Sequence, residues 1–600
     1  MARKKSRSAA PPVAIRHVAG HDRDTGARKQ MSRRQYVGYC LAVSLVVVVV
    51  KLWVGSYVPA SALMADDHEY LNRSIYVVRG DLKLTGYPFS RIAYGPLYSL
   101  ALSPWILFAD PSARMTLVFA INAILSSIAV FFGSLIVFRL ADTASLLVPV
   151  CLAVFAPLFQ FSFYAMSENL LFPLLMLVGW LIVDFEQTCR STLKSILLLL
   201  LASLLPLVRV PGLAVAPALP LLLWINRKRM GRRGSAALAL GLTVLVPAAA
   251  YVVAYRLGIE SNREESYLAT LGELVSHADR WLFLVKSTIS QMGYLFVSTG
   301  YWVLPVLVVI ALQVRGTFEE PNRQRWINYV TYAAVSSGAF LSFALVHLMQ
   351  KLNFGDSGFI YGRYNDPAGL LLLAGGLAAI LALKPLTGFQ RLLLRVVAPL
   401  VLCWDLRGMA GQAGQQWLPV NQCGLAIFAT GVSLPAVVLG AVVATFLNQL
   451  ADQKRWYAPA ALTLFVVFGL LSDYEGMTYT TLRARTVAYA FEGSEWIAAH
   501  VPNGASIGYD ASILQTPVPG MSFRTMEYVY PGMMFRTYPR RTVVVDSADK
   551  LRTVDYVYSI LSSTWMAKEE GKGLVRVWNN RAYVLYQVKR PSGTSAGPGA

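Results

Sequence analysis

Long apolar runs constrain this chain more than any other feature. The first spans residues 36–54, and many similar runs follow it almost to the C-terminal fifth of the sequence. A helix needs about 20 apolar residues to cross the hydrocarbon core of a bilayer. With 55% hydrophobic and only 14% charged residues among 600, the chain is not an ordinary soluble enzyme, a disordered regulator or a disulfide-rich secreted module. We therefore expect a polytopic α-helical membrane protein.

The apolar runs predict about 13 transmembrane helices, at ~20 residues per crossing. They cover residues 36–54, 115–140, 144–163, 169–185, 196–210, 211–225, 236–257, 293–314, 329–349, 368–383, 392–404, 424–447 and 457–471. Segment 92–109 is apolar too, and segment 194–224 is long enough for one helix or two. Loop charge decides both cases. The basic loop 226–233 lies on the same side as the basic N-terminus only if 92–109 does not cross and 194–224 crosses twice.

The same charge pattern predicts the orientation in the membrane. Residues 1–35 are basic and broken by Pro, Gly and Ser, which predicts a disordered cytoplasmic tail. The acidic loop 259–280 then lies outside. Although the net charge is +21, the basic runs flank apolar segments, so membrane lipid is the expected partner and nucleic acid is not. The chain is predicted to be a multi-pass plasma membrane protein, in a bacterial inner membrane.

The C-terminal part has a different character from the apolar region. We predict a transmembrane domain over residues 36–472 and an extracytoplasmic α/β domain over 473–588, followed by a flexible tail at 589–600. A helical stretch at 487–500 precedes β-rich runs at 506–510, 542–546, 555–560, 574–578 and 582–588. The chain has five cysteines and no CxxC pair. Cys403 and Cys423 either pair, if their loop faces an oxidising compartment, or remain two free thiols.

The densest acidic cluster lies in the first external loop, residues 55–114. Its sequence ADDHEY contains Asp66, Asp67, His68 and Glu69. Adjacent carboxylates repel one another unless a cation, a metal or a hydroxyl proton relieves them. A solvated loop without a task is the alternative. The rest of the loop is too apolar and aromatic to stay in water, which favours interfacial helices that hold the acids at the membrane surface.

Two further elements are predicted at the same external face. YAMSENLLFPLLML places Glu168 and Asn169 at the mouth of a helix, and YGRYNDP, residues 361–367, places Arg363 between two tyrosines. Arg209 lies between two short apolar segments at similar depth.

Together, DDHEY, the following YGPLY, the SEN segment and YGRYNDP resemble the polytopic glycosyltransferases of the GT-C superfamily. More narrowly, they are similar to the polyprenyl-phosphate-dependent branch that includes protein mannosyltransferases and aminoarabinose transferases. That branch often shows D-E-x-x-Y, and Asp66, Asp67 and Tyr70 occupy the same spacing. This chain differs in having Asp67 where many relatives have Glu.

The resemblance implies an inverting transfer of a sugar from a polyprenyl-phosphate donor to a hydroxyl acceptor, which is a cell-envelope glycan, a lipid or a protein. Asp66 would be the general base. Asp67 would orient the acceptor or, together with Asp66, help to ligate a divalent cation. Arg363 and Arg209 would bind the donor phosphate with their planar guanidinium groups.

The remaining candidates are expected to contact substrate. They are Glu168, Asn169, Tyr361, Tyr364, His68 and Glu69. Glu168 has an alternative role as an acidic helix start favoured by the helix dipole, and Arg209 as an interfacial arginine for any lipid headgroup. Two other functions stay open. A glycolipid transporter or flippase also needs many helices and a phosphate site, and a polysaccharide polymerase would use lipid-diphosphate-linked oligosaccharides.

Overall fold

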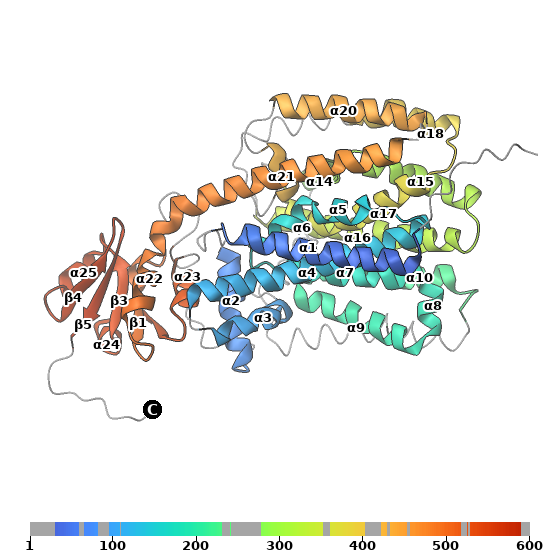
Figure 1. The fold of residues 1–600 in the computed structure, drawn as a ribbon. Helices are drawn as coiled ribbons and strands as arrows, with labels where there is room; N and C mark the ends of the chain where they lie inside the picture. The colour runs from blue at the N-terminus through green and yellow to red at the C-terminus, as the bar shows by residue number, and fades with distance from the viewer. Residues whose placement is uncertain are drawn as a thin grey trace, which may run out of the picture.

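Apolar helices form most of the chain, and a small α/β unit is seated at one end of them (Figure 1). The computed structural model describes residues 31–58, 65–81, 95–108, 110–230, 241, 278–351, 360–401, 422–428, 433–452, 456–517, 525 and 529–589. Most of the predicted N-terminal tail, most of the predicted span 236–257, and Cys403 lie outside these residues. The helix α1 (Arg33–Gly55) begins two residues before the predicted end of the tail.

Among the described residues, five helices are long and apolar enough to cross a membrane. They are α1, α4 (Pro111–Ala141), α16 (Asn322–Lys351), α17 (Gly362–Ala382) and α21 (Tyr457–Val487). Shorter apolar helices include α7 (Glu168–Val183), α9 (Thr192–Val208) and α10 (Ala218–Asn226). The polytopic helical class is confirmed, while the count of 13 crossings stays a prediction.

Two predicted single spans are broken helices in the structure. Residues 144–163 form α5 (Leu147–Ala153), α6 (Ala156–Gln160) and the 3₁₀ turn η3 (Phe161–Phe163). Pro157 at the start of α6 explains the first break, because proline cannot donate the helical hydrogen bond and clashes with the preceding turn. Residues 293–314 divide into α14 (Ala278–Ser298) and α15 (Val303–Thr317), which are bent by 95°. Gly300 and Tyr301 adopt positive φ at this bend.

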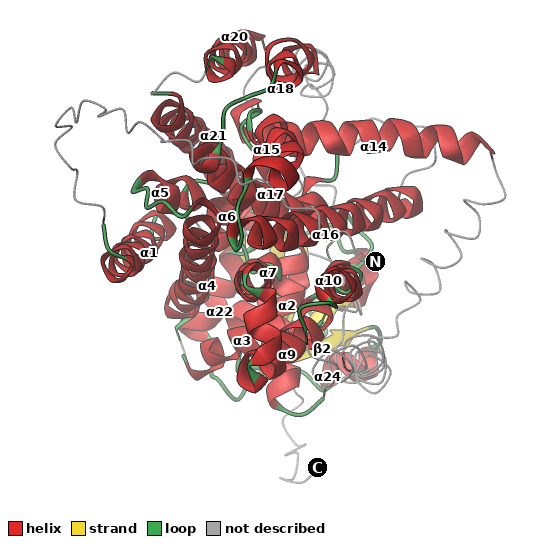
Figure 2. Ribbon diagram, turned by 90° about the vertical axis from the view of Figure 1, so that its right-hand side faces the viewer, coloured by secondary structure: helices red, strands yellow, loops and turns green. Residues whose placement is uncertain are grey.

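The helix α17 occupies the centre of the bundle. Figure 2, which looks along the helices, shows it among α4, α7, α15 and α16. Almost every residue of α17 is buried, including the polar ones at its start. Because α17 is enclosed by other helices, its first turn lies within the protein and not against lipid.

Short helices cover one end of the bundle. α2 (Ala65–Val78) lies across the direction of the long helices, next to α3 (Pro96–Leu102) and the 3₁₀ segment η2 (Ser103–Leu107) (Figure 1). The apolar segment 92–109, predicted not to cross, corresponds to α3 and η2. This cap carries the ADDHEY sequence.

The C-terminal unit is a five-stranded sheet with the strand order β2-β1-β3-β5-β4. The strands are β1 (Ser506–Asp510), β2 (Arg541–Val545), β3 (Tyr556–Ile560), β4 (Leu574–Asn579) and β5 (Tyr583–Val588), close to the predicted runs. β1 pairs in parallel with β2 and β3, whereas β5 is antiparallel to β3 and β4. The helix α21 continues past the predicted boundary at residue 473 and leads to α22 (Glu492–His500) in this unit.

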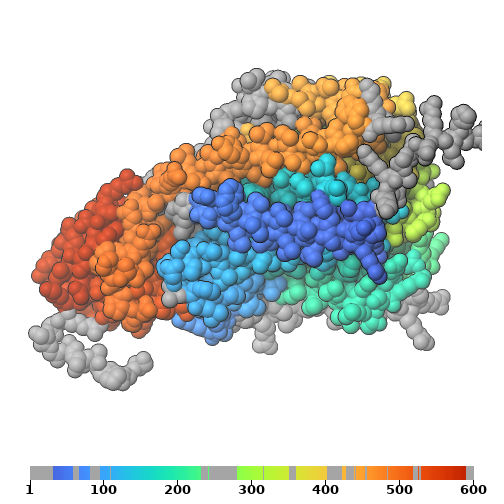
Figure 3. Space-filling view, in the orientation of Figure 1, coloured from blue at the N-terminus to red at the C-terminus, as the bar shows by residue number. Residues whose placement is uncertain are grey.

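The unit is docked firmly on the bundle (Figure 3). Arg114, near the start of α4, donates hydrogen bonds to the carbonyl oxygens of Phe535, Arg536 and Tyr538 at the end of α23 (Val529–Thr537). Asn72 of α2 donates to the Pro531 carbonyl at 2.8 Å. The sheet unit therefore contacts the cap that carries the acidic residues.

Candidate functional site

Four charged residues from four separate segments meet beneath the cap. Arg363 Nη1 donates to Asp66 Oδ2 at 2.5 Å, although the two residues are 297 positions apart. The other side of the same guanidinium binds Glu168, with 2.6 Å from Nε to Oε1 and 3.4 Å from Nη2 to Oε2. Arg209 forms a second ion pair with Glu168. The structure thus brings both predicted arginines to two of the predicted carboxylates.

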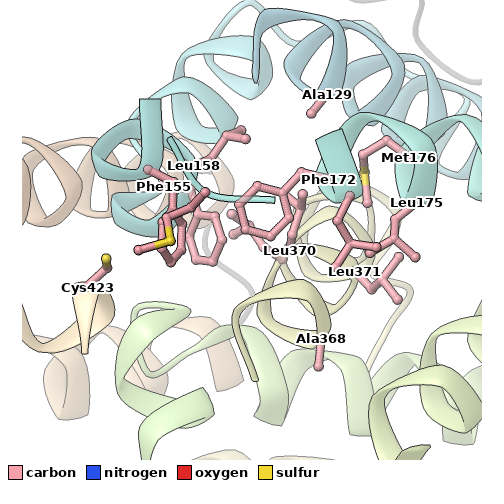
Figure 4. Close-up of a cluster of buried hydrophobic side chains, with 14 of the residues drawn as sticks. Ala129, Phe155, Leu158, Phe172, Leu175, Met176, Ala368, Leu370, Leu371 and Cys423 are labelled. Atoms are coloured by element: carbon pink, nitrogen blue, oxygen red, sulfur yellow. The ribbon is translucent and has the colours of Figure 1, made fainter. Parts of the chain in front are cut away.

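The first turns of α7 and α17 determine this meeting. Glu168 begins α7 and Arg363 is the second residue of α17, so both side chains lie at the same end of two packed helices. Figure 4 shows the apolar packing below them, where Phe172 of α7 lies close to Leu370 of α17. Since these cores fix the helices, a one-turn shift of either would separate Glu168 from Arg363.

Arg209 is presented by a break in the backbone. It lies between α9 and the 3₁₀ segment η4 (Val210–Val215) in extended conformation, and Pro211 follows it. Its guanidinium stacks over the Tyr364 ring at 4.3 Å from the centroid. Tyr361, Tyr364 and His347 form an aromatic group, with each of the two tyrosine rings 4.7 Å from His347. The predicted aromatic residues therefore line one side of the arginine pair.

The cap is tied to the site by Tyr70. Its hydroxyl donates to Ser167 Oγ at 2.8 Å, one residue before Glu168. Burial raises the pKa of this tyrosine above its ordinary value, so it stays a neutral donor at physiological pH. Burial also lowers the pKa of Arg73, on the next turn of α2. Tyr70 thereby aligns Asp66 with Glu168.

The other acidic-loop candidates face different surroundings. Successive residues on a helix point about 100° apart. Asp67 is fully buried and acts electrostatically on Tyr98 of α3, while the His68 ring lies 5.8 Å from Phe491 below the sheet unit. Glu69 is buried and interacts with Arg73. Asp66 thus pairs with Arg363, one of the two predicted phosphate ligands.

Asn169 has a structural task beside the site. Its amide nitrogen donates to the carbonyl oxygens of Phe161, Tyr164 and Met166 at 2.8, 2.9 and 3.1 Å. The backbone N–H groups of Tyr164 and Asn169 also donate to the carbonyls of Phe161 and Met166, so the Asn169 side chain reinforces the turns of this segment. Asn169 therefore holds the chain in place just before Glu168.

The metal role expected for Asp66 and Asp67 stays a prediction. Within the described ranges, no group of three or more His, Cys, Asp and Glu side chains is placed to hold a metal ion. Asp66 pairs with Arg363, and Asp67 is fully buried in the same helix.

Lys51 is a buried charge that the sequence prediction passed over. It lies four residues before the end of α1 and donates to Ser126 Oγ, the Leu158 carbonyl and Ser162 Oγ at 2.7, 2.8 and 2.8 Å. The sequence could have revealed Lys51, because it is the one lysine within the apolar run 36–54. Charged residues in membrane-spanning segments are rare and have specific partners. Lys51 anchors the broken segment that leads to Glu168.

A cavity of about 800 Å³ lies beside the site, between the bundle and the sheet unit. Its apolar lining includes Leu52, Met115 and Phe119, and its polar lining includes Glu495, Arg536 and Arg540. Arg536 stacks on Phe491, which separates it from His68 of α2. The lining of the cavity does not include Arg209 or Arg363.

These features define a polytopic helical membrane protein with an ion-paired site at one end of its bundle, under an α/β unit. The chain is similar to the crystal structure of ArnT from Cupriavidus metallidurans bound to undecaprenyl phosphate, with 14% identity, a TM-score of 0.45, and coverage of 92% of this chain and 98% of ArnT. It is similar to apo ArnT from the same organism, with 12% identity, a TM-score of 0.48, and coverage of 92% and 97%. No family model and no curated protein matches the chain.

Proposed function

We propose that this protein is a membrane glycosyltransferase that moves a sugar from a polyprenyl-phosphate donor to a hydroxyl acceptor at the extracytoplasmic face. The observation that carries the proposal is the convergence of Asp66, Glu168, Arg209 and Arg363 at one end of a bundle of apolar helices. Activation of a hydroxyl requires a base, which a carboxylate supplies, and departure of a phosphate requires positive charge, which two arginines supply.

The reaction would proceed by inversion at the anomeric carbon. The acceptor oxygen forms a bond to that carbon while the bond from the carbon to the phosphate oxygen breaks, through an oxocarbenium-like state. The acceptor proton passes to the Asp66 carboxylate, and the bonding electron pair leaves with the polyprenyl phosphate. No other reactant is needed to balance the step.

The arginines would stabilise the leaving group. Charge develops on the phosphate as its bond to the sugar breaks, and preorganised guanidinium donors lower the barrier most where water is excluded. Arg363 is 3% exposed and Arg209 is 10% exposed, so both act in such surroundings. The ring of Tyr364 lies under the Arg209 guanidinium and supports it by a cation–π contact.

The proposed orientation follows the loop charges. The N-terminus would lie in the cytoplasm, and the cap and the sheet unit outside, in a bacterial inner membrane. A site at the helix ends suits lipid phosphate, which lies at headgroup depth, whereas transporters usually place ionisable groups near the midplane on broken helices.

A transfer assay tests the proposal. Protein reconstituted in liposomes is incubated with polyprenyl phosphates carrying single sugars and an extract of envelope glycans and lipids, and release of polyprenyl phosphate is followed by chromatography. Asp66→Asn should lower release by about 10²–10⁴-fold, the usual contribution of a general base. Glu495→Gln, which removes an exposed acid from the sheet unit, is the matched control.

Three outcomes would redirect the assignment. Full release by the Asp66→Asn protein would remove the general base and with it the proposed mechanism. If only a diphosphate-linked oligosaccharide is consumed, the protein is a polymerase. Movement of the intact glycolipid across the liposome membrane without release would identify a transporter.

A further inference from the structure

Arg363 is shared by two carboxylates with very different exposure. The Asp66 side chain is 30% exposed, whereas that of Glu168 is fully buried. A buried carboxylate that loses its guanidinium has no water to replace it, and such a loss is strongly unfavourable. A partly exposed carboxylate can exchange its partner for water at little cost. Asp66 is therefore the partner that Arg363 can exchange.

Glu168 has the opposite character because it binds both arginines. Its carboxylate accepts from Arg363 on one side and pairs with Arg209 on the other. The backbone before it is fixed by Asn169 and by the hydrogen bond from Tyr70 to Ser167. Glu168 thus holds the two guanidinium groups at a constant separation and leaves Arg363 Nη1 directed at Asp66.

We propose that Glu168 is a positioning residue for both arginines, and that the donor phosphate replaces Asp66 on Arg363. The inference rests on the proposed function. Before the donor binds, the pair with Arg363 keeps Asp66 a weak base, since a guanidinium contact favours the charged, unprotonated carboxylate. Once phosphate takes this position, the Asp66 carboxylate turns to the acceptor hydroxyl. The base therefore becomes competent only when the leaving group is seated.

The exchange needs no movement of the cap. The helix α2 is held at three points, by Tyr70 on Ser167, by Asn72 on the Pro531 carbonyl, and by Ser74, which accepts from Trp105 Nε1 at 2.7 Å. Rotation of the Asp66 side chain is sufficient. Asp66 also lies in the first turn of α2, where the helix dipole stabilises a carboxylate that has lost its arginine.

The proposal orders the reaction. The donor must bind before the acceptor is deprotonated, because the acceptor cannot find a competent base while Asp66 is paired. A permanently unpaired carboxylate would not have this property.

Binding of farnesyl phosphate to the purified full-length protein in detergent tests the exchange without any knowledge of sugar or acceptor. Asp66→Asn removes the competitor, and we expect about three- to tenfold tighter binding. Asp66→Ser serves as a second variant if the first is unstable. Glu168→Asp keeps the charge but cannot reach both arginines, and we expect at least about tenfold weaker binding.

Glu495→Gln is the control for overall charge, because it removes one acid from the same side of the membrane and should leave the affinity unchanged within about twofold. Equal or weaker binding by both Asp66 variants, with normal binding by the wild type, overturns the exchange while the proposed function stands. Tightening by Glu495→Gln to the same extent also overturns it. Absence of binding by the wild type refutes the prenyl-phosphate donor itself.

Discussion

Arg114 is expected to hold the sheet unit on the bundle. The residue is fully buried, and its guanidinium donates to the Phe108 carbonyl at 2.7 Å, to those of Phe535 and Arg536 at 2.9 and 3.2 Å, and to that of Tyr538 at 2.6 Å. Three of these carbonyls lie at the end of α23, where a helix leaves its last carbonyls without intrahelical partners. Arg114→Met keeps the apolar stem and removes every donor.

The size of the effect follows from these contacts. A hydrogen bond to a charged group contributes about 1.5–3 kcal/mol, and neighbouring bonds are not additive, so the loss of three at α23 should cost about 4 kcal/mol. This corresponds to roughly 10³-fold faster amide exchange in α23, at ~1.4 kcal/mol per factor of ten.

Hydrogen exchange measured by mass spectrometry on peptides covering residues 529–537 tests whether amide exchange in α23 is faster in the Arg114→Met protein. Arg139→Met is the matched control, because Arg139 lies at the other end of α4 and pairs with Asp184 at 3.5 Å. Exchange in the Arg114→Met protein within about threefold of wild type would refute the reasoning, as would an equal acceleration in the control.

Three further predictions concern the bundle and the sheet unit. Lys51→Met should lower the midpoint of thermal unfolding in detergent, because two serine hydroxyls and a carbonyl lose their charged donor; an unchanged midpoint would count against the anchoring role. Gly362→Ala should destabilise the protein because a Cβ would overlap the Tyr294 ring, whereas Gly338→Ala, with open space around it, should stay within about 1 kcal/mol of wild type in the same melts. Burial raises the pKa of Tyr530 well above its ordinary value. Its contribution to stability is therefore complete below about pH 10 and is lost as the pH rises, because the tyrosine of the unfolded chain ionises first. The absorbance of tyrosinate during alkaline unfolding measures this, and full ionisation of the tyrosine before unfolding would contradict it.

Much of the fold could be predicted because its signals are local. The run 36–54 is apolar over its whole length, and the structure has α1 there. The β-rich runs at 506–510 and 582–588 carry aromatic and β-branched residues, and β1 and β5 occupy them. The break near Arg209 was predicted from loop charge, with Pro206 and Pro211 as the expected separators; Pro211 follows the break, whereas Pro206 lies inside α9. The prediction of one continuous helix at 144–163 was wrong, because average hydropathy does not show where a proline interrupts a helix.

The site was only partly predictable for a related reason. The types of residue needed for phosphate and hydroxyl chemistry could be read from the motifs, but their directions could not. Asp66 and Asp67 are neighbours with equal chemistry, and only the orientation of α2 pairs Asp66 with Arg363 and leaves Asp67 fully buried. The side-chain amide of Asn169 is a group that could bind a sugar, yet its nitrogen donates hydrogen bonds to three backbone carbonyls.

The sequence by itself determined that this chain lies in a membrane, because so many apolar residues have no other low-energy environment, and it placed the charged motifs at helix ends. Only the tertiary structure decided which charges meet. Residues nearly 300 positions apart become partners when packed helices bring their first turns to one end, and the pairing of Arg363 with both Asp66 and Glu168 depends on that packing. Burial, a property of the assembled bundle, then makes one of these carboxylates fixed and the other exchangeable.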